Sequence, residues 1–176
     1  RMCTMAEAGQ AFKIKFKVMN EHFYHVSVAW NKDRKGIMCS PELNAPTQSN
    51  GCIEVATPPE FPKGIPGIWS PEHLFTAAVN SCLMTTFLAI AENSKLEFTA
   101  FTSNAMGKLE QIDGKFLMTE VELQPVVTIV HEKDRERAER VLTKAEAACL
   151  ISNSIKSKVS MNPKIIISST EVVEHG

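Results

Sequence analysis

A long apolar segment with a clear helix start constrains the fold more than any other feature. Residues 70–72 read Ser-Pro-Glu. Serine is a good N-cap, proline suits the first helical position, and an acid in the first turn favours the helix dipole. We therefore expect a helix from residue 70 to about residue 93. Its apolar residues occupy most faces: Leu74, Phe75, Val79, Leu83, Met84, Phe87, Leu88 and Ile90. Such a helix is buried inside its own protein or at a subunit interface.

The same segment is about as long as one membrane span. Its most apolar part is residues 74–91, but Asn80, Ser81, Thr85 and Thr86 interrupt that part. A spanning helix is normally apolar throughout. The pattern therefore favours a buried helix and no membrane association.

The N-terminal residues carry no apolar signal sequence. Residues 1–10 lack an h-region, so we expect a disordered leader there and a cytoplasmic protein. Residues 11–176 are long enough to bury one core, and we expect a single domain. The formal net charge is −1, with acids and bases mixed along the chain. That balance argues against nucleic-acid binding, which usually requires a clustered basic surface.

Alternating apolar residues predict strands on both sides of the helix. Residues 12–18 and 24–30 alternate with a period of two, and shorter strands are expected around Ile37 and at residues 52–56. Between residues 58 and 69, four prolines and two glycines predict an ordered loop. After the helix, residues 96–111 and 115–129 predict two long strands, and Asp113-Gly114 between them is a strong hairpin signal.

The C-terminal part predicts a second helix and a last strand. Asp134 can cap a helix whose apolar stripe runs through Ala138, Val141, Leu142, Ala145 and Cys149. A short helical piece is expected to follow to residue 160, with a final strand at residues 165–173. The whole order predicts an α+β fold with mainly antiparallel sheet.

Five cysteines carry most of the chemical interest: Cys3, Cys39, Cys52, Cys82 and Cys149. In a reducing compartment they are expected to be free or redox-active thiols rather than structural disulfides. Taken alone, Cys82 and Cys149 also fit simple core packing, because free cysteine behaves as a small hydrophobe. Periodicity cannot choose between packing and reactivity.

Metal and cofactor sites are not indicated. His22 and His25 lie near Cys39 and Cys52, but no C-x-x-C or H-E-x-x-H pattern is present. Residues three apart on a strand face opposite sides, so the two histidines would diverge. The sequence contains no glycine-rich phosphate loop. We expect neither a metal nor a cofactor.

Two segments resemble the motifs of the OsmC/Ohr family, the osmotically inducible and organic hydroperoxide resistance proteins. Residues 70–82 read SPEHLFTAAVNSC, with the cysteine ten positions after Glu72, as in that family. Residues 145–154 read AEAACLISNS and are similar to the second cysteine motif, in which serine follows the cysteine by three residues. The order of elements from about residue 12 to residue 173 also agrees. The resemblance implies an OsmC-like fold with sheets wrapped around a buried central helix.

The resemblance also implies a two-cysteine peroxidase acting on organic hydroperoxides. Cys82 would attack the peroxide and become a sulfenic acid, and Cys149 would resolve it as a disulfide. An external dithiol would reduce that disulfide. The family forms an intertwined homodimer with active sites at the subunit interface. The alternative is a stress-associated or ligand-binding member without significant peroxidase turnover.

In the family, an arginine held by the residue corresponding to Glu72 stabilises the thiolate. The matching turn here is residues 30–36, where Lys32 takes the arginine position and Arg34 follows. Arg34 could offer Glu72 a bidentate guanidinium, whereas Lys32 offers only a point charge. We therefore expect Arg34 to serve Cys82. Equally, the turn could be a solvated charge cluster, and Glu72 could serve only the helix N-terminus.

Overall fold

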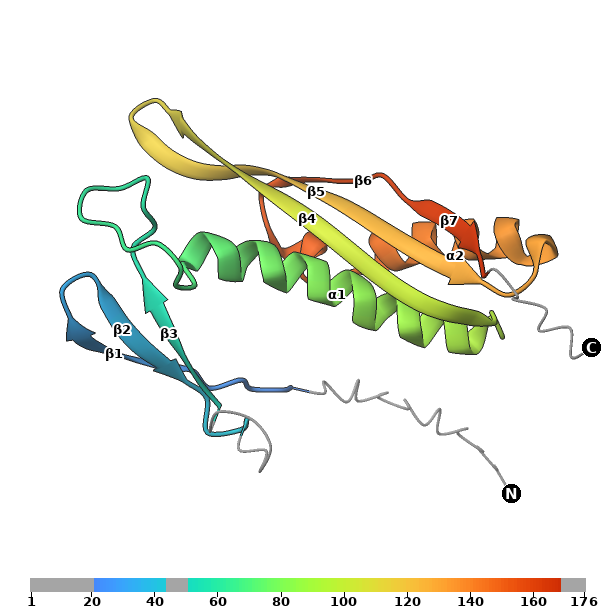
Figure 1. The fold of residues 1–176 in the computed structure, drawn as a ribbon, viewed down its shortest axis with the longest axis horizontal. Coiled ribbons are helices and arrows are strands. Elements are labelled where there is room, and N and C mark those ends of the chain that lie inside the picture. The colour runs from blue at the N-terminus through green and yellow to red at the C-terminus, as the bar shows by residue number, and fades with distance from the viewer. Residues whose placement is uncertain (1–20, 44–50, 169–176) are drawn as a thin grey trace, which may run out of the picture.

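The computed structural model describes residues 21–43 and 51–168, which form two sheets and two α-helices (Figure 1). The expected leader, the expected strand at residues 12–18 and Cys3 lie outside the described residues. The end of the expected final strand, residues 169–173, also lies outside them.

The N-terminal strands form a small antiparallel sheet. Its members are β1 (Ser27–Lys32), β2 (Lys35–Cys39) and β3 (Cys52–Ala56), in the order β1-β2-β3. Asp33 adopts a φ of 51° in the tight turn between β1 and β2, a conformation that aspartate tolerates better than most residues. This sheet stands apart from the second sheet of the chain (Figure 1).

The second sheet is built on the predicted hairpin. β4 (Phe98–Ile112) and β5 (Lys115–Ile129) are antiparallel, and Asp113 and Gly114 both have positive φ at the turn. Positive φ at both central residues is what a two-residue hairpin turn of type I′ requires. Two short strands, β6 (Lys158–Met161) and β7 (Lys164–Ile167), pair with β5 in parallel. The sheet is therefore mixed.

The prediction of a helical piece that reaches residue 160 is wrong. A short 3-10 helix, η2 (Ser152–Ser154), ends earlier and is followed by β6. Val159 and Met161 pack on the core while Lys158 and Ser160 are exposed. This alternation has the period of a strand, and pairing with β5 satisfies its backbone.

The long helix α1 (Pro71–Asn93) begins where the sequence predicts. The Ser70 hydroxyl accepts a hydrogen bond from the His73 backbone N–H at 3.3 Å, as an N-cap does. The fully buried residues of α1 form one stripe with a spacing of four: Val79, Leu83, Phe87 and Ala91.

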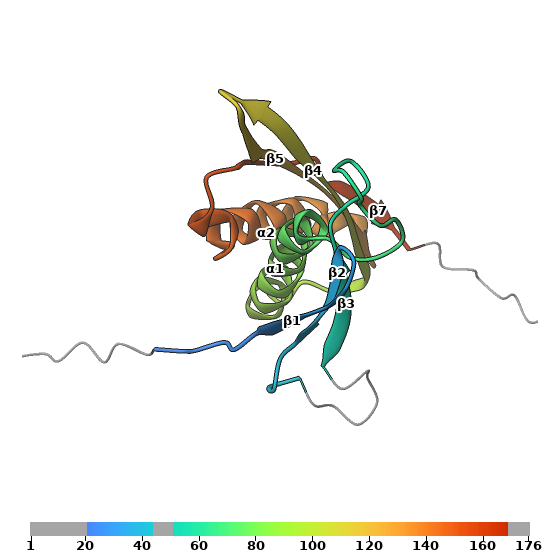
Figure 2. The ribbon, with the colours of Figure 1, turned by 90° about the vertical axis from the view of Figure 1, so that its left-hand side faces the viewer.

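The opposite face of α1 is open in the single chain, whereas the sequence predicts a helix buried inside its own protein or at a subunit interface. Met84 is 39% exposed and Leu88 is 42% exposed. One chain covers only one stripe, because α2 and the hairpin both approach α1 from the same side (Figure 2). By length and composition α1 also meets the criteria for a membrane-spanning helix. The core helix of a globular protein can meet the same criteria.

The second helix completes the core. The 3-10 helix η1 (Glu132–Asp134) leads into α2 (Arg135–Ala148). Asp134 occupies the N-cap position, but its side chain makes no cap hydrogen bond and pairs with Arg137 at 3.3 Å instead. The buried residues of α2 are Ala138, Val141, Leu142 and Ala145, and α2 packs against α1.

Two cysteines are not free thiols. Cys39 and Cys52 form a disulfide, which corrects the expectation for this pair, whereas Cys82 and Cys149 are free. The two residues face each other across β2 and β3. Sequence spacing did not reveal the pair, because strand register depends on tertiary pairing.

Leu142→Ala should lower the free energy of unfolding by about 2–5 kcal/mol, since Leu142 is fully buried between α2 and the rest of the core. Denaturant unfolding followed by circular dichroism measures this loss. Lys144→Ala on the exposed face of the same helix is the matched control, expected within about 0.5 kcal/mol of the parent. Equal losses in both variants would contradict the assigned core.

Candidate active site

The two free thiols meet where α1 packs against the C-terminal end of α2. Cys82 lies on α1 next to the buried Leu83 and is itself partly exposed. Cys149 follows the last residue of α2 and is fully buried. The two side chains interact, and each shifts the pKa of the other. Residues 67 positions apart in sequence therefore form one dithiol site.

Hydrogen-bond donors converge on the Cys82 sulfur. Burial by itself raises the pKa of Cys82, and the hydrogen bond from the Cys149 thiol is the largest effect that lowers it. The Ile151 N–H, 3.5 Å from the sulfur, lowers the pKa further, as do the Thr86 hydroxyl and the Leu150 N–H. The net result is a Cys82 pKa below its ordinary value.

Cys149 has the opposite bias. Burial raises its pKa, and the contact with Cys82 raises it further. Cys149 is therefore the proton-bearing partner, and its thiol donates toward Cys82. A pair whose pKa values diverge has one thiolate nucleophile and one thiol held in reserve.

The other predicted residues lie at the N-terminal end of α1. Glu72 is in the first turn, ten residues before Cys82, so about 15 Å of helix axis separates them. Arg34 lies in the turn between β1 and β2, and it lines a pocket of about 760 Å³ together with Glu72, Trp30 and Phe61. The structure thus brings Arg34 near Glu72, and Cys82 near Cys149, as two separate pairs.

No ion pair joins Arg34 to Glu72 in the part of the chain that the structure describes. Arg34 and Lys32 are both exposed. One carboxylate oxygen of Glu72, Oε2, is buried without a hydrogen-bond partner. A buried carboxylate oxygen without a donor is costly, so this atom is a natural acceptor for an incoming guanidinium.

Sequence reasoning missed the donors around Cys82. Thr86 lies one helical turn after Cys82, a spacing that could have pointed to it. The Leu150 and Ile151 amides follow Cys149 directly, but their direction depends on the chain turning from α2 into η2. Only the tertiary structure aims them at the sulfur.

Cys149→Ala should raise the pKa of Cys82, because it removes the largest effect that lowers it. The alkylation rate of Cys82 by iodoacetamide, followed against pH by peptide mass spectrometry, should then inflect at higher pH than in the parent. Thr85→Val is the control, since the Thr85 hydroxyl donates to the Cys82 carbonyl at 3.1 Å and not to the sulfur. An unchanged inflection in Cys149→Ala would contradict the assigned donor.

Comparison with known proteins shows which family this chain resembles. The family model for OsmC-like protein matches residues 64–164. The uncharacterized protein YmaD of Bacillus subtilis is 22% identical over 146 residues, which cover 81% of this chain and 93% of that protein.

Solved structures share the fold. An OsmC-like protein of unknown function from Vibrio cholerae is 24% identical, with a TM-score of 0.69 over 82% of this chain and 99% of that one. An organic hydroperoxide resistance protein from Elizabethkingia anophelis is 22% identical, with a TM-score of 0.64 over 85% and 99%. The α+β architecture is therefore the OsmC-like one. With the family model covering more than half of its residues, the chain belongs to the OsmC-like protein family.

Proposed function

We propose that the protein reduces organic hydroperoxides with electrons from an external dithiol. The observation that carries the proposal is the contact between a partly exposed thiol of lowered pKa, Cys82, and a buried second thiol, Cys149. A low-pKa thiol that solvent can reach, next to a resolving thiol, is the arrangement that peroxide chemistry needs.

The proposed reaction has three steps. The Cys82 thiolate attacks the outer oxygen of the hydroperoxide, the O–O bond breaks, and the alkoxide leaves as an alcohol after gaining a proton. Cys82 is now a sulfenic acid. The Cys149 sulfur attacks it, water leaves, and a Cys82–Cys149 disulfide forms. A dithiol then reduces the disulfide by exchange, becoming a disulfide itself.

Similarity to named relatives supports this chemistry. The Elizabethkingia protein and OhrB of Bacillus subtilis are organic hydroperoxide resistance proteins. OhrB is 18% identical to this chain, with a TM-score of 0.54. These likenesses are of fold, so the activity itself is our proposal.

The proposal includes a homodimer, in which a second copy of the chain completes the site. Among the described residues, no cation shifts the Cys82 pKa, and Arg34 and Glu72 of the same chain lie at the N-terminal end of α1. A second copy laid over the open face of α1 would cover Met84 and Leu88 and could bring its own Arg34 to Cys82. The Arg34 pocket, with Val28, Trp30 and Phe61 in its wall, suits an alkyl tail.

A second function has one observation in its favour. In the described chain, neither Arg34 nor Lys32 is paired with Glu72. A family member without an anchored cation would act as a stress-associated or ligand-binding protein with little turnover. In either case we propose that the protein acts in the cytoplasm, where dithiol reductants are abundant.

Cys82→Ser should abolish dithiol-dependent consumption of an organic hydroperoxide, because serine cannot form the sulfenic acid. Cys149→Ser should still complete a first turnover and accumulate a Cys82 sulfenic acid that dimedone traps. Ser81→Ala is the matched control, since Ser81 is exposed and bonds only the Ala78 carbonyl. An inactive parent protein would favour the non-enzymatic function.

Mixed dimers test whether the site is shared. Neither Cys82→Ser nor Arg34→Ala should be active alone, whereas a refolded equal mixture should regain about a quarter of the parent activity. Half of the dimers would then be mixed, each with one intact Cys82 facing an intact partner Arg34. The control is the Lys32→Ala variant, tested in the same way as Arg34→Ala. It should be active without mixing. An inactive mixture of the first pair would place both residues of a working site on one chain, and a monomer in sedimentation would exclude sharing.

A further inference from the structure

The Cys39–Cys52 disulfide joins two residues that lie directly opposite each other on β2 and β3. The next pair outward, Ser40 and Gly51, is linked by a backbone hydrogen bond from the Ser40 N–H to the Gly51 carbonyl at 3.1 Å. Bonded and non-bonded pairs alternate along an antiparallel ladder, so Cys39 and Cys52 form a non-hydrogen-bonded pair. Side chains are closest at such pairs, so strand pairing itself places Cys39 opposite Cys52.

Other contacts between β2 and β3 lie on both sides of this bond. The β2–β3 ladder continues inward from the cysteines to the pair Lys35 and Ala56, and the Ser40–Gly51 bond closes it on the outer side. The Lys35 ammonium also pairs with Glu54 of β3 at 2.9 Å. Backbone pairing therefore flanks the disulfide on both sides.

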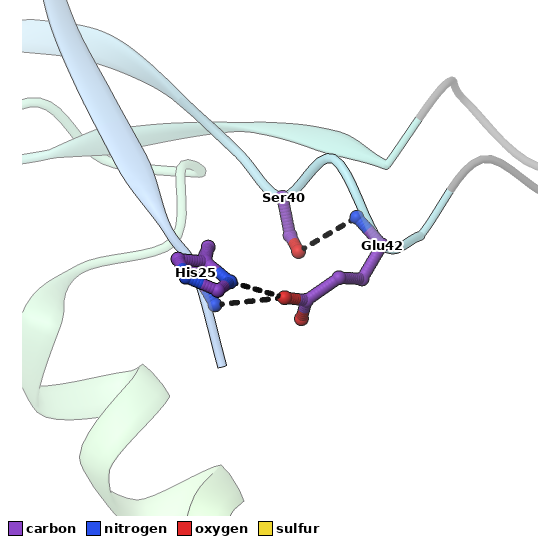
Figure 3. Close-up of polar contacts among 3 residues, drawn as sticks. All are labelled: His25, Ser40 and Glu42. Carbon is purple, nitrogen blue, oxygen red and sulfur yellow. Dashed lines mark hydrogen bonds and ion pairs between the residues drawn. The ribbon is translucent and has the colours of Figure 1, made fainter. Parts of the chain in front are cut away.

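The residues just after Cys39 have an anchor of their own (Figure 3). The Glu42 carboxylate accepts hydrogen bonds from the His25 backbone N–H at 3.1 Å and lies 2.6 Å from its ring Nδ1. The Glu42 N–H donates to the Ser40 hydroxyl at 3.3 Å. These contacts tie the end of β2 to the segment before β1, without using either sulfur.

The bond is also within reach of a reductant. Cys39 and Cys52 are both partly exposed, and neither belongs to the buried core cluster. β3 is the outer strand of its sheet, and Trp69 bridges it at Val55. Cleavage of the disulfide therefore requires no opening of the core around α1 and α2.

We propose that Cys39 and Cys52 form a second, reversible thiol–disulfide couple, separate from the Cys82–Cys149 pair, whose substrates are dithiols. A dithiol thiolate attacks one sulfur, the Cys39–Cys52 bond breaks, and a mixed disulfide forms while the other cysteine leaves as a thiolate and gains a proton. The second thiol of the reductant then displaces the protein sulfur. The products are two protein thiols and one oxidised dithiol.

Reversibility follows from the strand register. In the reduced form the ladder still holds the two thiols opposite each other. An oxidised dithiol can then reverse the exchange: one protein thiolate opens its disulfide to form a mixed disulfide, and the prepositioned second protein thiol displaces the dithiol, which leaves reduced. Disulfides in reducing compartments are usually transient or redox-sensing, and a couple that opens without unfolding fits that use. The proposal is independent of whether Cys82 reduces peroxides.

The test uses the full chain carrying Cys82→Ser and Cys149→Ser, which removes the other pair. The folded protein is incubated with dithiothreitol without denaturant, quenched with acid, alkylated and mapped by mass spectrometry. We expect alkylation of both Cys39 and Cys52 and an unchanged circular dichroism spectrum. A second reduced sample, returned to oxidised dithiothreitol before it is quenched and alkylated, should carry no adduct at either residue. A parallel sample with Cys39→Ser and Cys52→Ser should gain no adducts in this region.

Two results would overturn the proposal. One is a disulfide that dithiothreitol reduces only when denaturant is present, which would make it an inaccessible structural bond. The other is loss of the folded spectrum on reduction, which would make it a staple that the sheet requires. Either result leaves the peroxide assay of the parent protein unaffected, so the two proposals fail separately.

Discussion

The packing of α1 against α2 is the contact on which the rest of the structure depends. The buried stripe of α1 is centred on Leu83 and Phe87, and α2 meets it with a stripe that includes Ala138 and Ala145. Small residues let two helices approach closely, and the hairpin of β4 and β5 packs against the same assembly. Cys149 ends the α2 stripe and thereby reaches Cys82.

This contact also decides how the thiolate is stabilised. Mid-helix, Cys82 gains little from the dipole of α1. The turn from α2 into η2 supplies instead the Cys149 thiol and two backbone amides, which together lower the Cys82 pKa despite the burial that raises it. The described chain thus prepares its nucleophile with neutral donors. A cation from a second copy would act on a thiol that is already biased toward ionisation.

One-sided burial is the second constraint. α1 is apolar on most faces, but a single chain buries one stripe and leaves Met84 and Leu88 open. The unpartnered Oε2 of Glu72 and the exposed Arg34 lie near the N-terminal end of the same helix. In the proposed dimer, a second subunit would cover the apolar face and could offer a donor to the carboxylate oxygen.

The sequence by itself determined the elements that local chemistry encodes. Ser70-Pro71 starts α1 because cap and proline preferences act within one turn, and Asp113-Gly114 forms the hairpin because its backbone needs positive φ. The two cysteine motifs identified the family and the candidate thiols. Tertiary structure alone decided the β6 pairing, the Cys39–Cys52 bond, the amides aimed at Cys82 and the open face of α1. Each depends on which distant segments meet, and periodicity in one segment carries no information about its partner.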